Sequence, residues 1–383
     1  MKLFSEGKNY KLYQGSMLDM LEVIEPNSVD SIVTDPPYEL GFMNKGWDAS
    51  GIAFQKETWE KCYTVLKSGG YLLAFGGTRT FHRIACAIED AGFEIRDTIM
   101  WLYGAGFPKS MNLGKAIESR VDCQTDEAKQ WVGWGTTLKP AYEPVIVARK
   151  PCEGSCIDNV LKYGVGGINI DACRIPTADT KNDGEINENG RFPSNVILTY
   201  DDTDFDEVCG GMPVGGQNGS ISKPYKMNNT IYGEYGHCNT WTAYADEGSA
   251  ARYFYCAKAS KKDRDEGLDD FKAQQKYYCD GRGNSLEIFG STDGGRKPLK
   301  NIHPTVKPVD LMQYLVRLVT PPNGTVLDPF NGSGSTGKAC MYENRERDAG
   351  YKYIGIELTP EYLPISDARI SYVANQMKKR RLI

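Results

Sequence analysis

The chain has 383 residues, of which 40% are hydrophobic and 25% are charged, and its net charge is −5 at pH 7. This composition is typical of a folded protein of two or three domains and excludes disorder, collagen and coiled coil. The negative charge requires that any nucleic-acid site be a local basic surface. Three histidines are too few for a multi-histidine centre, so we expect no metal.

The cysteines and the amino terminus bear on the compartment. Eleven scattered cysteines, several of them in apolar segments, are typical of reduced thiols in a cytoplasm. The first residues lack the apolar stretch of a signal peptide, and no run of 18 apolar residues would span a membrane. We therefore expect a cytoplasmic protein that has no membrane partner. Cys152 and Cys156 form a CxxxC pair that is followed by Cys173, which leaves a zinc site open as an alternative.

The first 150 residues alternate short apolar runs with helical patterns. This alternation predicts βαβ units around a mostly parallel sheet. The expected strands cover 31–34, 71–75, 93–103 and 144–149, and the expected helices cover about 54–67 and 79–90.

From about residue 151 the texture of the sequence changes. Glycine, asparagine and aspartate become dense, and acidic stretches alternate with basic ones, which predicts an inserted, loop-rich region. The βα pattern returns after residue 300, with expected helices over 308–320, 335–342 and 360–377 and expected strands over 325–327 and 353–356. The predicted domains are 1–150, 151–300 and 301–383, of which the first and the last build one α/β unit.

The segment Thr34-Asp35-Pro36-Pro37-Tyr38 directly follows the first expected strand. Two prolines stiffen the backbone and remove two N–H donors, which leaves a carboxylate and a carbonyl to accept from one amine group. The tyrosine ring supplies a stacking surface, and the carboxyl end of a strand is where α/β proteins bind ligands. A plain Asp-Pro-Pro loop is the structural alternative.

The segment 326–337 reads Val-Leu-Asp-Pro-Phe-Asn-Gly-Ser-Gly-Ser-Thr-Gly, an acidic strand end followed by a glycine-rich turn that opens a helix. Glycines let a backbone approach a ligand closely. The next expected strand ends in Glu357, where a carboxylate can accept from two ribose hydroxyls.

Two further patterns suggest other chemistries. Gly332 to Lys338 spells the GxxxxGK of a phosphate-binding loop, but Ala339 stands where a hydroxyl would hold Mg²⁺. Pro151-Cys152 is the dipeptide of cytosine C5 methylation, in which the glycine-rich turn comes before the cysteine rather than long after it. Both readings are therefore disfavoured.

Together the first two segments resemble the DNA amino-methyltransferases, which use S-adenosylmethionine to methylate adenine N6 or cytosine N4. Asp35 to Tyr38 matches the catalytic motif of that family, and 328–334 matches its cofactor motif. Their order, with a variable region between them, is that of the circularly permuted β class. His303-Pro-Thr-Val-Lys307-Pro308 resembles a further family segment, and Lys139-Pro-Ala-Tyr-Glu-Pro144 resembles a prophage-type branch.

The resemblance implies an α/β Rossmann-like methyltransferase fold. Its sheet is expected to be mostly parallel and seven-stranded, with helices on both faces, circularly permuted and interrupted by an inserted target-recognition region. One departure is Gly15-Ser16, where the family usually has Gly-Asp near the cofactor adenine.

The resemblance also implies roles for individual residues. Asp35 and the Pro36 carbonyl hold the target amine, Pro37 stiffens the loop, and Tyr38 stacks on a base that has left the duplex. The cofactor residues are expected to be Asp328, Pro329, Phe330, Gly332, Ser333, Gly334 and Glu357, with Thr305 and Lys307 at the cofactor carboxylate. The expected DNA contacts are Lys45 and Trp47 after the catalytic motif, and Lys258, Lys261, Lys262 and Arg264 in the inserted region.

The implied function is that of a site-specific, adenine-specific methyltransferase. It acts on double-stranded DNA in the cytoplasm and is encoded by a bacterium, a phage or a prophage. Aspartate first and tyrosine last in the catalytic motif is commoner among adenine enzymes than among cytosine N4 enzymes. A cytosine N4 enzyme, a methyltransferase of RNA or protein amines, and a non-catalytic DNA-binding module are the alternatives. A homodimer and a cognate restriction endonuclease stay open.

Overall fold

The computed structural model describes residues 2–40, 46–104, 110–121, 125–176, 190–200, 254–258, 261–273, 278–279, 285–286 and 300–380. A ten-stranded sheet lies at its centre, in the order β1-β2-β12-β11-β3-β4-β6-β5-β7-β8. Its strands are β1 (Lys2–Gly7), β2 (Tyr10–Gln14), β3 (Val29–Thr34), β4 (Leu66–Phe75), β5 (Glu94–Tyr103), β6 (Tyr142–Arg149), β7 (Val196–Tyr200), β8 (Tyr255–Lys258), β11 (Thr325–Asp328) and β12 (Lys352–Glu357). β9 (Tyr278–Cys279) and β10 (Ser285–Leu286) pair separately.

Among these described strands, six of the nine neighbouring pairs in the large sheet are parallel. The antiparallel pairs are β1–β2, β4–β6 and β5–β6. The expected α/β sheet with mostly parallel pairs is therefore confirmed, but the expected number of seven strands is wrong, because the described sheet has ten. The additional strands lie at both margins: β1 at one, and β7 and β8 at the other.

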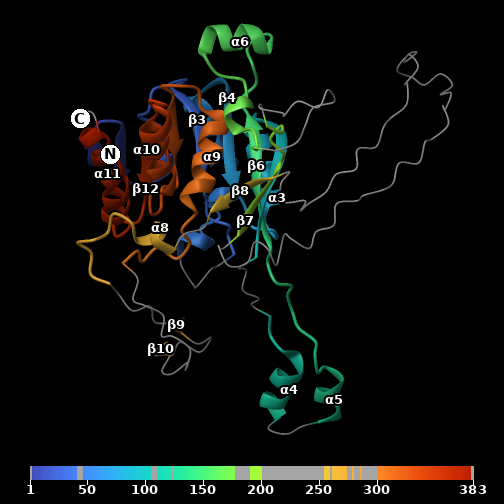
Figure 1. The fold of residues 1–383 in the computed structure, drawn as a ribbon. Helices are drawn as coiled ribbons and strands as arrows, with labels where there is room; N and C mark the ends of the chain where they lie inside the picture. Colours follow the sequence, from blue (N-terminus) through green and yellow to red (C-terminus); the bar gives the residue numbers. More distant parts are fainter. Residues whose placement is uncertain are drawn as a thin grey trace, which may run out of the picture.

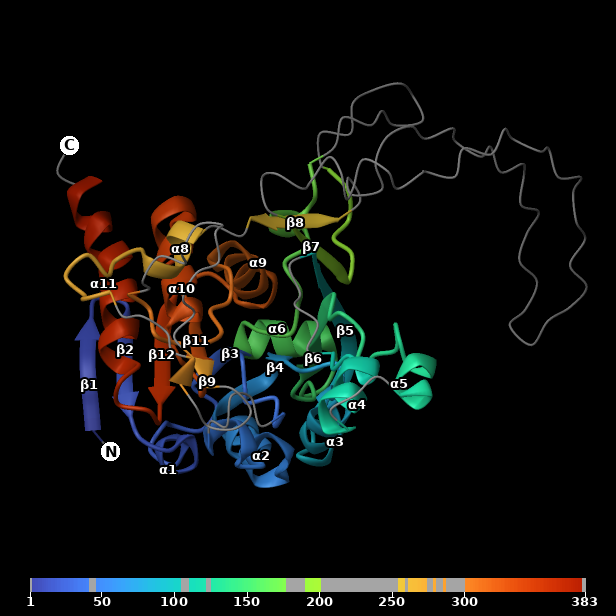
Figure 2. The same cartoon turned by 90° about the horizontal axis from the view of Figure 1, so that it is seen from below.

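Helices cover both faces of the sheet, as expected. Figure 2 shows α9, α10 and α11 on one side and α1, α2 and α3 on the other. The helices of these two layers are α1 (Met17–Leu21), α2 (Lys56–Val65), α3 (Phe81–Asp90), α9 (Val309–Val319), α10 (Ser335–Arg347) and α11 (Leu363–Arg380). The short 3₁₀ turns are η2 (Gly46–Ala49), η3 (Ile52–Phe54) and η4 (Asp171–Cys173).

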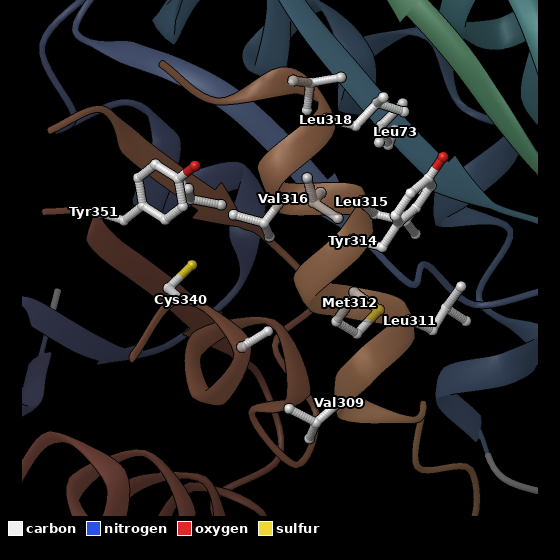
Figure 3. Packing of buried hydrophobic residues seen from close by; sticks show 14 of the residues in the cluster. Leu73, Val309, Leu311, Met312, Tyr314, Leu315, Val316, Leu318, Cys340 and Tyr351 are labelled. Atoms are coloured by element: carbon white, nitrogen blue, oxygen red, sulfur yellow. The ribbon is translucent and has the colours of Figure 1, made fainter. Parts of the chain in front are cut away.

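The two faces are built by the alternation of side chains along each strand. Val33 of β3 and Leu73 of β4 enter the core under α9 and α10. Their chain neighbours Ile32 and Leu72 enter the opposite core under α1, α2 and α3. Figure 3 shows the first core, where the apolar side of α9 packs between β4 and α10. β3 and residues 71–75 of β4 are buried on both faces, as expected for central strands that helices cover on each side.

The region predicted as an inserted domain contributes to this sheet. β7 pairs with β5 and β8 pairs with β7, both in parallel. These strands extend the margin of the catalytic sheet, so the described parts of 151–300 that contain them belong to its architecture. The domain boundaries themselves stay a prediction.

Two small helical segments project from opposite ends of the sheet (Figure 1). Between β5 and β6 the chain forms α4 (Leu113–Val121) and α5 (Asp126–Gln130). We call residues 110–121 and 125–141 the arm. After β6 comes α6 (Cys156–Tyr163), at the end of the molecule away from the arm. No helix in the described ranges has the length and apolar character needed to cross a membrane.

Candidate active site

The predicted catalytic and cofactor segments meet at one edge of the sheet. Leu327 of β11 pairs with Ile32 of β3, and Asp328 pairs with Gly355 of β12, all in parallel. The carboxyl ends of these three strands therefore lie side by side. β6 runs the other way, so its first residues reach the same edge: Phe75 at the end of β4 pairs with Val145.

Asp35 lies at this edge against a buried lysine. Lys307 Nζ lies 2.7 Å from Asp35 Oδ2, and the lysine side chain is only 8% exposed. Asp35 Oδ1 is buried and has no hydrogen-bond partner among the described residues. Burial raises the pKa of Asp35, and the positive charge of Lys307 opposes that rise. One oxygen of the Asp35 carboxylate thus pairs with Lys307, and the other oxygen is available to a hydrogen-bond donor.

Glu143 completes a compact polar cluster. Its Oε2 lies 3.3 Å from Lys307 Nζ and accepts a 2.6 Å hydrogen bond from the hydroxyl of Tyr38. Its Oε1 accepts a longer bond, 3.4 Å, from the hydroxyl of Tyr103. Burial, followed by the charges of Asp35 and Glu143, raises the pKa of Tyr38 well above its usual value. Tyr38 therefore stays protonated, and its hydroxyl is held by the carboxylate of Glu143.

The backbone around the catalytic motif is fixed from several directions. Pro36 is buried, and the carbonyl of Tyr38 accepts from the hydroxyl of Thr80 at 2.8 Å. The buried carboxylate of Asp48 accepts from the backbone N–H groups of Glu39 and Leu40. This fixed backbone holds the Asp35 carboxylate and the Pro36 carbonyl in a defined relation before any ligand binds.

Asp328 shapes the glycine-rich turn from inside. Its Oδ1 accepts from the hydroxyl of Thr34 at 2.6 Å, and its Oδ2 accepts from the hydroxyl of Thr336 at 2.7 Å. The residue is 2% exposed, and burial raises its pKa to about 6. Both oxygens thus serve protein donors, and Asp328 ties the catalytic strand to the cofactor turn.

Glu357 lies next to the turn at the end of β12. Its Oε2 accepts from the backbone N–H of Gly332 and its Oε1 from that of Thr359, both at 2.7 Å. Burial raises its pKa to about 7. Each oxygen retains acceptor capacity, which suits the ribose hydroxyls expected at this position. Ser16, which follows the end of the neighbouring strand β2, caps α1 by accepting from the N–H of Leu18.

Two glycines of the turn are required by the backbone conformation and by the packing around them. Gly332 has a φ of +51°, and an added Cβ would lie 2.9 Å from Nε2 of His303. Gly334 has a φ of +77°, and an added Cβ would lie 2.5 Å from the hydroxyl oxygen of Ser366. The side chains of His303 and Ser366 therefore pack closely against the turn, which leaves no room for a residue larger than glycine at these two positions.

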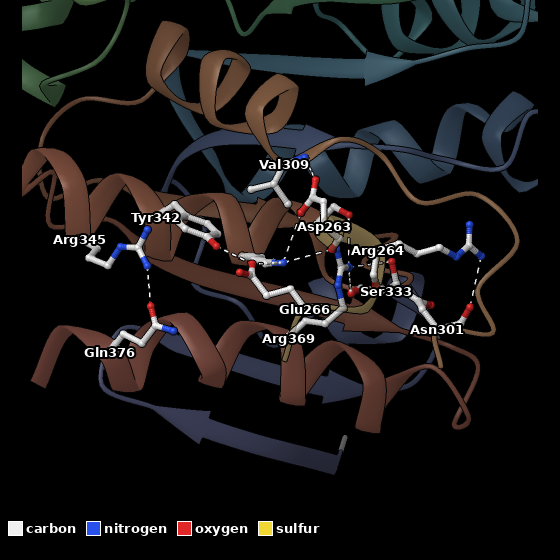
Figure 4. A network of polar contacts seen from close by, with 12 residues as sticks. Asp263, Arg264, Glu266, Asn301, Val309, Ser333, Tyr342, Arg345, Arg369 and Gln376 are labelled. Carbon is white, nitrogen blue, oxygen red and sulfur yellow. Dashed lines mark hydrogen bonds and ion pairs between the residues drawn. The ribbon is translucent and has the colours of Figure 1, made fainter. Parts of the chain in front are cut away.

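Figure 4 shows how α8 (Lys261–Asp265) and α11 hold the same turn. Arg369, which is fully buried, donates to the carbonyl and the hydroxyl of Ser333 at 2.5 and 3.0 Å. It also donates to the carbonyl of Asp263 at 3.4 Å. The Asp263 carboxylate accepts from the backbone N–H of Val309, so α8 joins the turn to α9.

The predicted catalytic and cofactor residues lie on two sides of the site. Asp35, Pro36, Pro37 and Tyr38 lie with Lys307 on the catalytic side, whereas Pro329, Phe330 and Gly332 to Gly334 lie with Glu357 on the turn side. Lys307 pairs with Asp35, although it was expected at the cofactor carboxylate. Thr305 is exposed, and its carbonyl accepts from Nδ1 of His303 at 2.7 Å.

The predicted DNA contacts are described only in part. Arg264 donates to the backbone carbonyls of Asn301 and His303, which favours a structural role. Lys45 lies outside the described residues, as do the side chains of four further candidates: Trp47, Lys258, Lys261 and Lys262. The phosphate contacts stay predictions.

Two alternative chemistries can be judged from the geometry. Lys338 of the GxxxxGK pattern is fully buried and pairs with Asp263 at 3.3 Å and Glu266 at 2.8 Å, so its amine does not face a phosphate. Cys152 and Cys156 lie with their sulfurs 3.8 Å apart beyond the far end of β6. Within the described ranges, no third histidine, cysteine or carboxylate joins them in a metal-binding group.

Sequence reasoning missed the roles of Glu143, Thr34 and Thr336. Glu143 belongs to the Lys139–Pro144 segment, but its position at the edge depends on the antiparallel direction of β6. The two threonines are adjacent to recognised motifs, and a buried Asp328 needs hydroxyl donors nearby. That requirement is the signal that could have found them.

The comparison with known families decides the class. Residues 29–368 match the N6/N4 methyltransferase family model, which is described as DNA methylase. The chain belongs to this family. S-Adenosylmethionine is the methyl donor of these methylases, so the cofactor prediction is confirmed.

The methylase also resembles individual proteins over shorter stretches. It is 32% identical over 117 residues to the type II methyltransferase M.HindIII of Haemophilus influenzae, covering 30% of this chain and 37% of that one. It is 43% identical over 77 residues to the putative methylase YubD of Escherichia coli, covering 20% and 31% of the two chains. These matches span about a third of each relative's length.

The fold also has loose counterparts among solved structures. The PvuII DNA methyltransferase, which is cytosine-N4-specific, is 15% identical with a TM-score of 0.46, and the match covers 99% of this chain and 97% of that one. M1.HpyAVI in complex with SAM is 16% identical with a TM-score of 0.42, and the match covers 94% and 98%.

Proposed function

We propose that this methylase transfers a methyl group from S-adenosylmethionine to the N6 amine of an adenine flipped out of double-stranded DNA. The buried Oδ1 of Asp35, without a partner among the described residues, is the observation that carries the proposal. A buried carboxylate oxygen is costly unless a donor reaches it, and an exocyclic amine is such a donor. The base has to leave the duplex because its amine is otherwise paired.

The catalytic motif positions the amine. One N–H donates to Asp35 Oδ1 and the other to the Pro36 carbonyl, so the nitrogen lone pair points away from both acceptors. Bound S-adenosylmethionine supplies an electrophilic methyl group. When the amine nitrogen attacks the methyl carbon, the new N–C bond would form as the C–S bond of the sulfonium breaks, the cofactor would leave as a neutral thioether, and the methylated amine would lose one proton to water. Most of the acceleration comes from placing the reacting atoms in line. Tyr38 stacks on the base, and its hydroxyl bond to Glu143 fixes the plane of the ring.

Lys307 favours the charge state of Asp35 that the proposal needs, whereas the charge of Glu143 raises the pKa of Asp35, so Glu143 contributes by holding the lysine in place. The ammonium of Lys307 favours the ionised form of Asp35, which can accept from the amine. Glu143 holds the ammonium from its other side at 3.3 Å. These two residues act as positioning groups in the proposal.

The cofactor site is proposed around Glu357 and the turn from Pro329 to Gly334. Glu357 accepts the ribose hydroxyls, while Phe330 and the backbone of Gly332 border the cofactor. Asp328, Ser333 and Gly334 shape the turn from within. Thr305, on the exposed loop before Lys307, remains a candidate for the cofactor carboxylate.

Several finer assignments belong to the same proposal. The catalytic strand β3 precedes the cofactor strand β11 in the chain, which supports the circularly permuted β arrangement. The aspartate and tyrosine of the catalytic motif favour adenine over cytosine N4, and the Lys139–Pro144 segment favours the prophage-type branch. Double-stranded DNA is the proposed partner, and the domain limits of 1–150, 151–300 and 301–383 and the cytoplasmic location are kept as predictions.

The proposal is tested by identifying the methylated base. We would incubate the enzyme with unmodified genomic DNA and methyl-labelled S-adenosylmethionine, digest the DNA and identify the labelled nucleoside by mass spectrometry. N6-methyladenine supports the proposal, N4-methylcytosine replaces the base assignment, and absence of label from every DNA contradicts the function.

The Asp35→Asn and Asp35→Ala variants locate the chemistry. Both remove the anionic acceptor, so transfer is expected to fall at least about a hundredfold. Asp35 lies on the catalytic side of the site, so cofactor affinity measured by calorimetry is expected to stay within about twofold. A variant with wild-type turnover would exclude Asp35 as the amine acceptor.

A further inference from the structure

The arm is the most exposed apolar part of the described chain. Trp131 is 40% exposed, Trp134 59% and Leu138 92%, whereas Trp59 and Trp101 are buried in the core. The two exposed indole rings lie edge to face with their centroids 5.2 Å apart. Among the described arm residues, Ala128 is the one buried hydrophobic side chain. A segment this small cannot bury its own aromatic surface.

The arm is joined directly to the active site. Tyr103 ends β5 and Glu143 lies near the start of β6, and both belong to the polar cluster around Lys307. The backbone N–H of Tyr103 donates to the carbonyl of Ala141 at 2.9 Å, which closes the base of the arm as a hairpin. Figure 1 shows the arm extending outward from this base.

The arm has a small excess of basic residues. Lys115, Arg120, Lys129 and Lys139 stand against Glu118, Asp126 and Glu127, which gives the arm a net charge of +1 although the whole chain carries −5. Lys129 pairs with Asp126 at 2.9 Å, so Lys139 is the basic residue of the arm nearest to β6. An exposed aromatic surface with a small basic excess, joined to the catalytic edge, suits DNA, whose phosphates attract the basic side chains and whose bases stack on indole rings. A duplex that delivers a base to Asp35 has to lie along this edge.

We propose that the arm binds double-stranded DNA and that Trp131 and Trp134 contact the bases beside the extruded adenine. An aromatic side chain there compensates for the stacking that the flipped base gives up. This inference rests on the proposed function and adds the arm as the element that binds the duplex. It also moves DNA recognition in part from the expected 151–300 region to the β5–β6 connection.

The test compares three double variants. Trp131→Ala with Trp134→Ala removes both rings, and Trp131→Phe with Trp134→Phe keeps aromatic faces. Ile157→Ala with Leu161→Ala removes even more exposed apolar side chains (73% and 81%) from α6 at the opposite end. Binding is followed by fluorescence anisotropy of a labelled random duplex, and KM and kcat are measured on genomic DNA.

The alanine pair in the arm is expected to weaken duplex binding about tenfold or more and to raise KM for DNA. Its cofactor affinity should stay unchanged. The phenylalanine pair should recover most of the binding, and the α6 pair should behave as wild type. Wild-type duplex binding by the alanine pair in the arm would overturn the proposal.

Loss of self-association by that variant in sedimentation, with DNA binding intact, would also overturn it and assign the surface to a second copy of the chain. The proposed function fails separately, because its failure is the absence of methyl transfer to DNA by the wild-type enzyme.

Discussion

Lys307 opposes the burial that raises the pKa of Asp35, and removing the lysine should show in the pH dependence of the reaction. In Lys307→Met the Asp35 anion loses its cation, so its pKa rises further and less of it is ionised at a given pH. We expect the acidic limb of the kcat/KM profile to move to higher pH, with lower activity at neutral pH.

Lys307→Arg is the matched control, because it keeps the charge and should keep the limb near its wild-type position. If Lys307→Met instead loses cofactor affinity and the limb does not move, the lysine holds the cofactor carboxylate, as the sequence first suggested.

Glu357 should make cofactor binding depend on pH. Its pKa is raised to about 7 by burial, and ribose hydroxyls donate more strongly to the anion than to the acid. Affinity for S-adenosylmethionine is therefore expected to increase as pH rises through about 7. Calorimetry across that range measures it. Glu357→Gln should bind more weakly and with a flat pH dependence; a pH dependence retained by this variant would assign the titration elsewhere.

At the scale of elements, α9 and α10 are joined by a buried ion pair. Arg317 donates to both oxygens of Glu343, whose side chain is 1% exposed. In Arg317→Met the buried carboxylate loses its main counter-charge, which typically costs about 3–5 kcal/mol. Urea unfolding should show this loss.

The exposed pair between Lys56 and Glu60 provides a control, because Lys56→Met should leave the urea unfolding curve close to that of the wild type. A loss in Arg317→Met as small as that in Lys56→Met would mean that the buried pair contributes little to the packing of α9 on α10.

The elements that the sequence predicted well are those with local signals. The expected strand 325–327 and helix 335–342 correspond to β11 and α10, because apolar periodicity and glycine turns mark them. The helix expected over 54–67 ends at Val65, because Leu66 is already extended and begins β4. β7 and β8 were assigned to an insert, since pairing with β5 is a long-range choice that no local pattern reveals.

The residues of the site, like the elements of the fold, could be predicted where the signal is local in the sequence. Asp35 and Glu357 follow strands and could be placed at the edge from the sequence. The partner of Lys307 could not, because a pairing across 272 positions depends on how β3 meets the loop before α9. Glu143 was hidden for a similar reason: its location depends on the direction of β6.

At the scale of the whole molecule, the arm should be separable from the fold. Leu102 pairs with Tyr142 at its base, so a short Gly-Ser turn in place of residues 105–140 can close the hairpin. We expect unchanged cofactor affinity and a melting temperature within a few degrees, because the arm contributes little to the cores. Methyl transfer to DNA should fall at least about tenfold. Retained transfer would place duplex binding outside the arm.

The reversed direction of β6 has a further consequence. Because this strand enters the sheet at the catalytic edge, the chain leaves and re-enters through neighbouring strands that are already hydrogen-bonded. Changes in the length or sequence of the excursion between them do not shift any strand register. Under the proposed role of the arm, exchanging this hairpin would therefore change the contact with the duplex and leave Asp35, Lys307 and the cofactor turn in place.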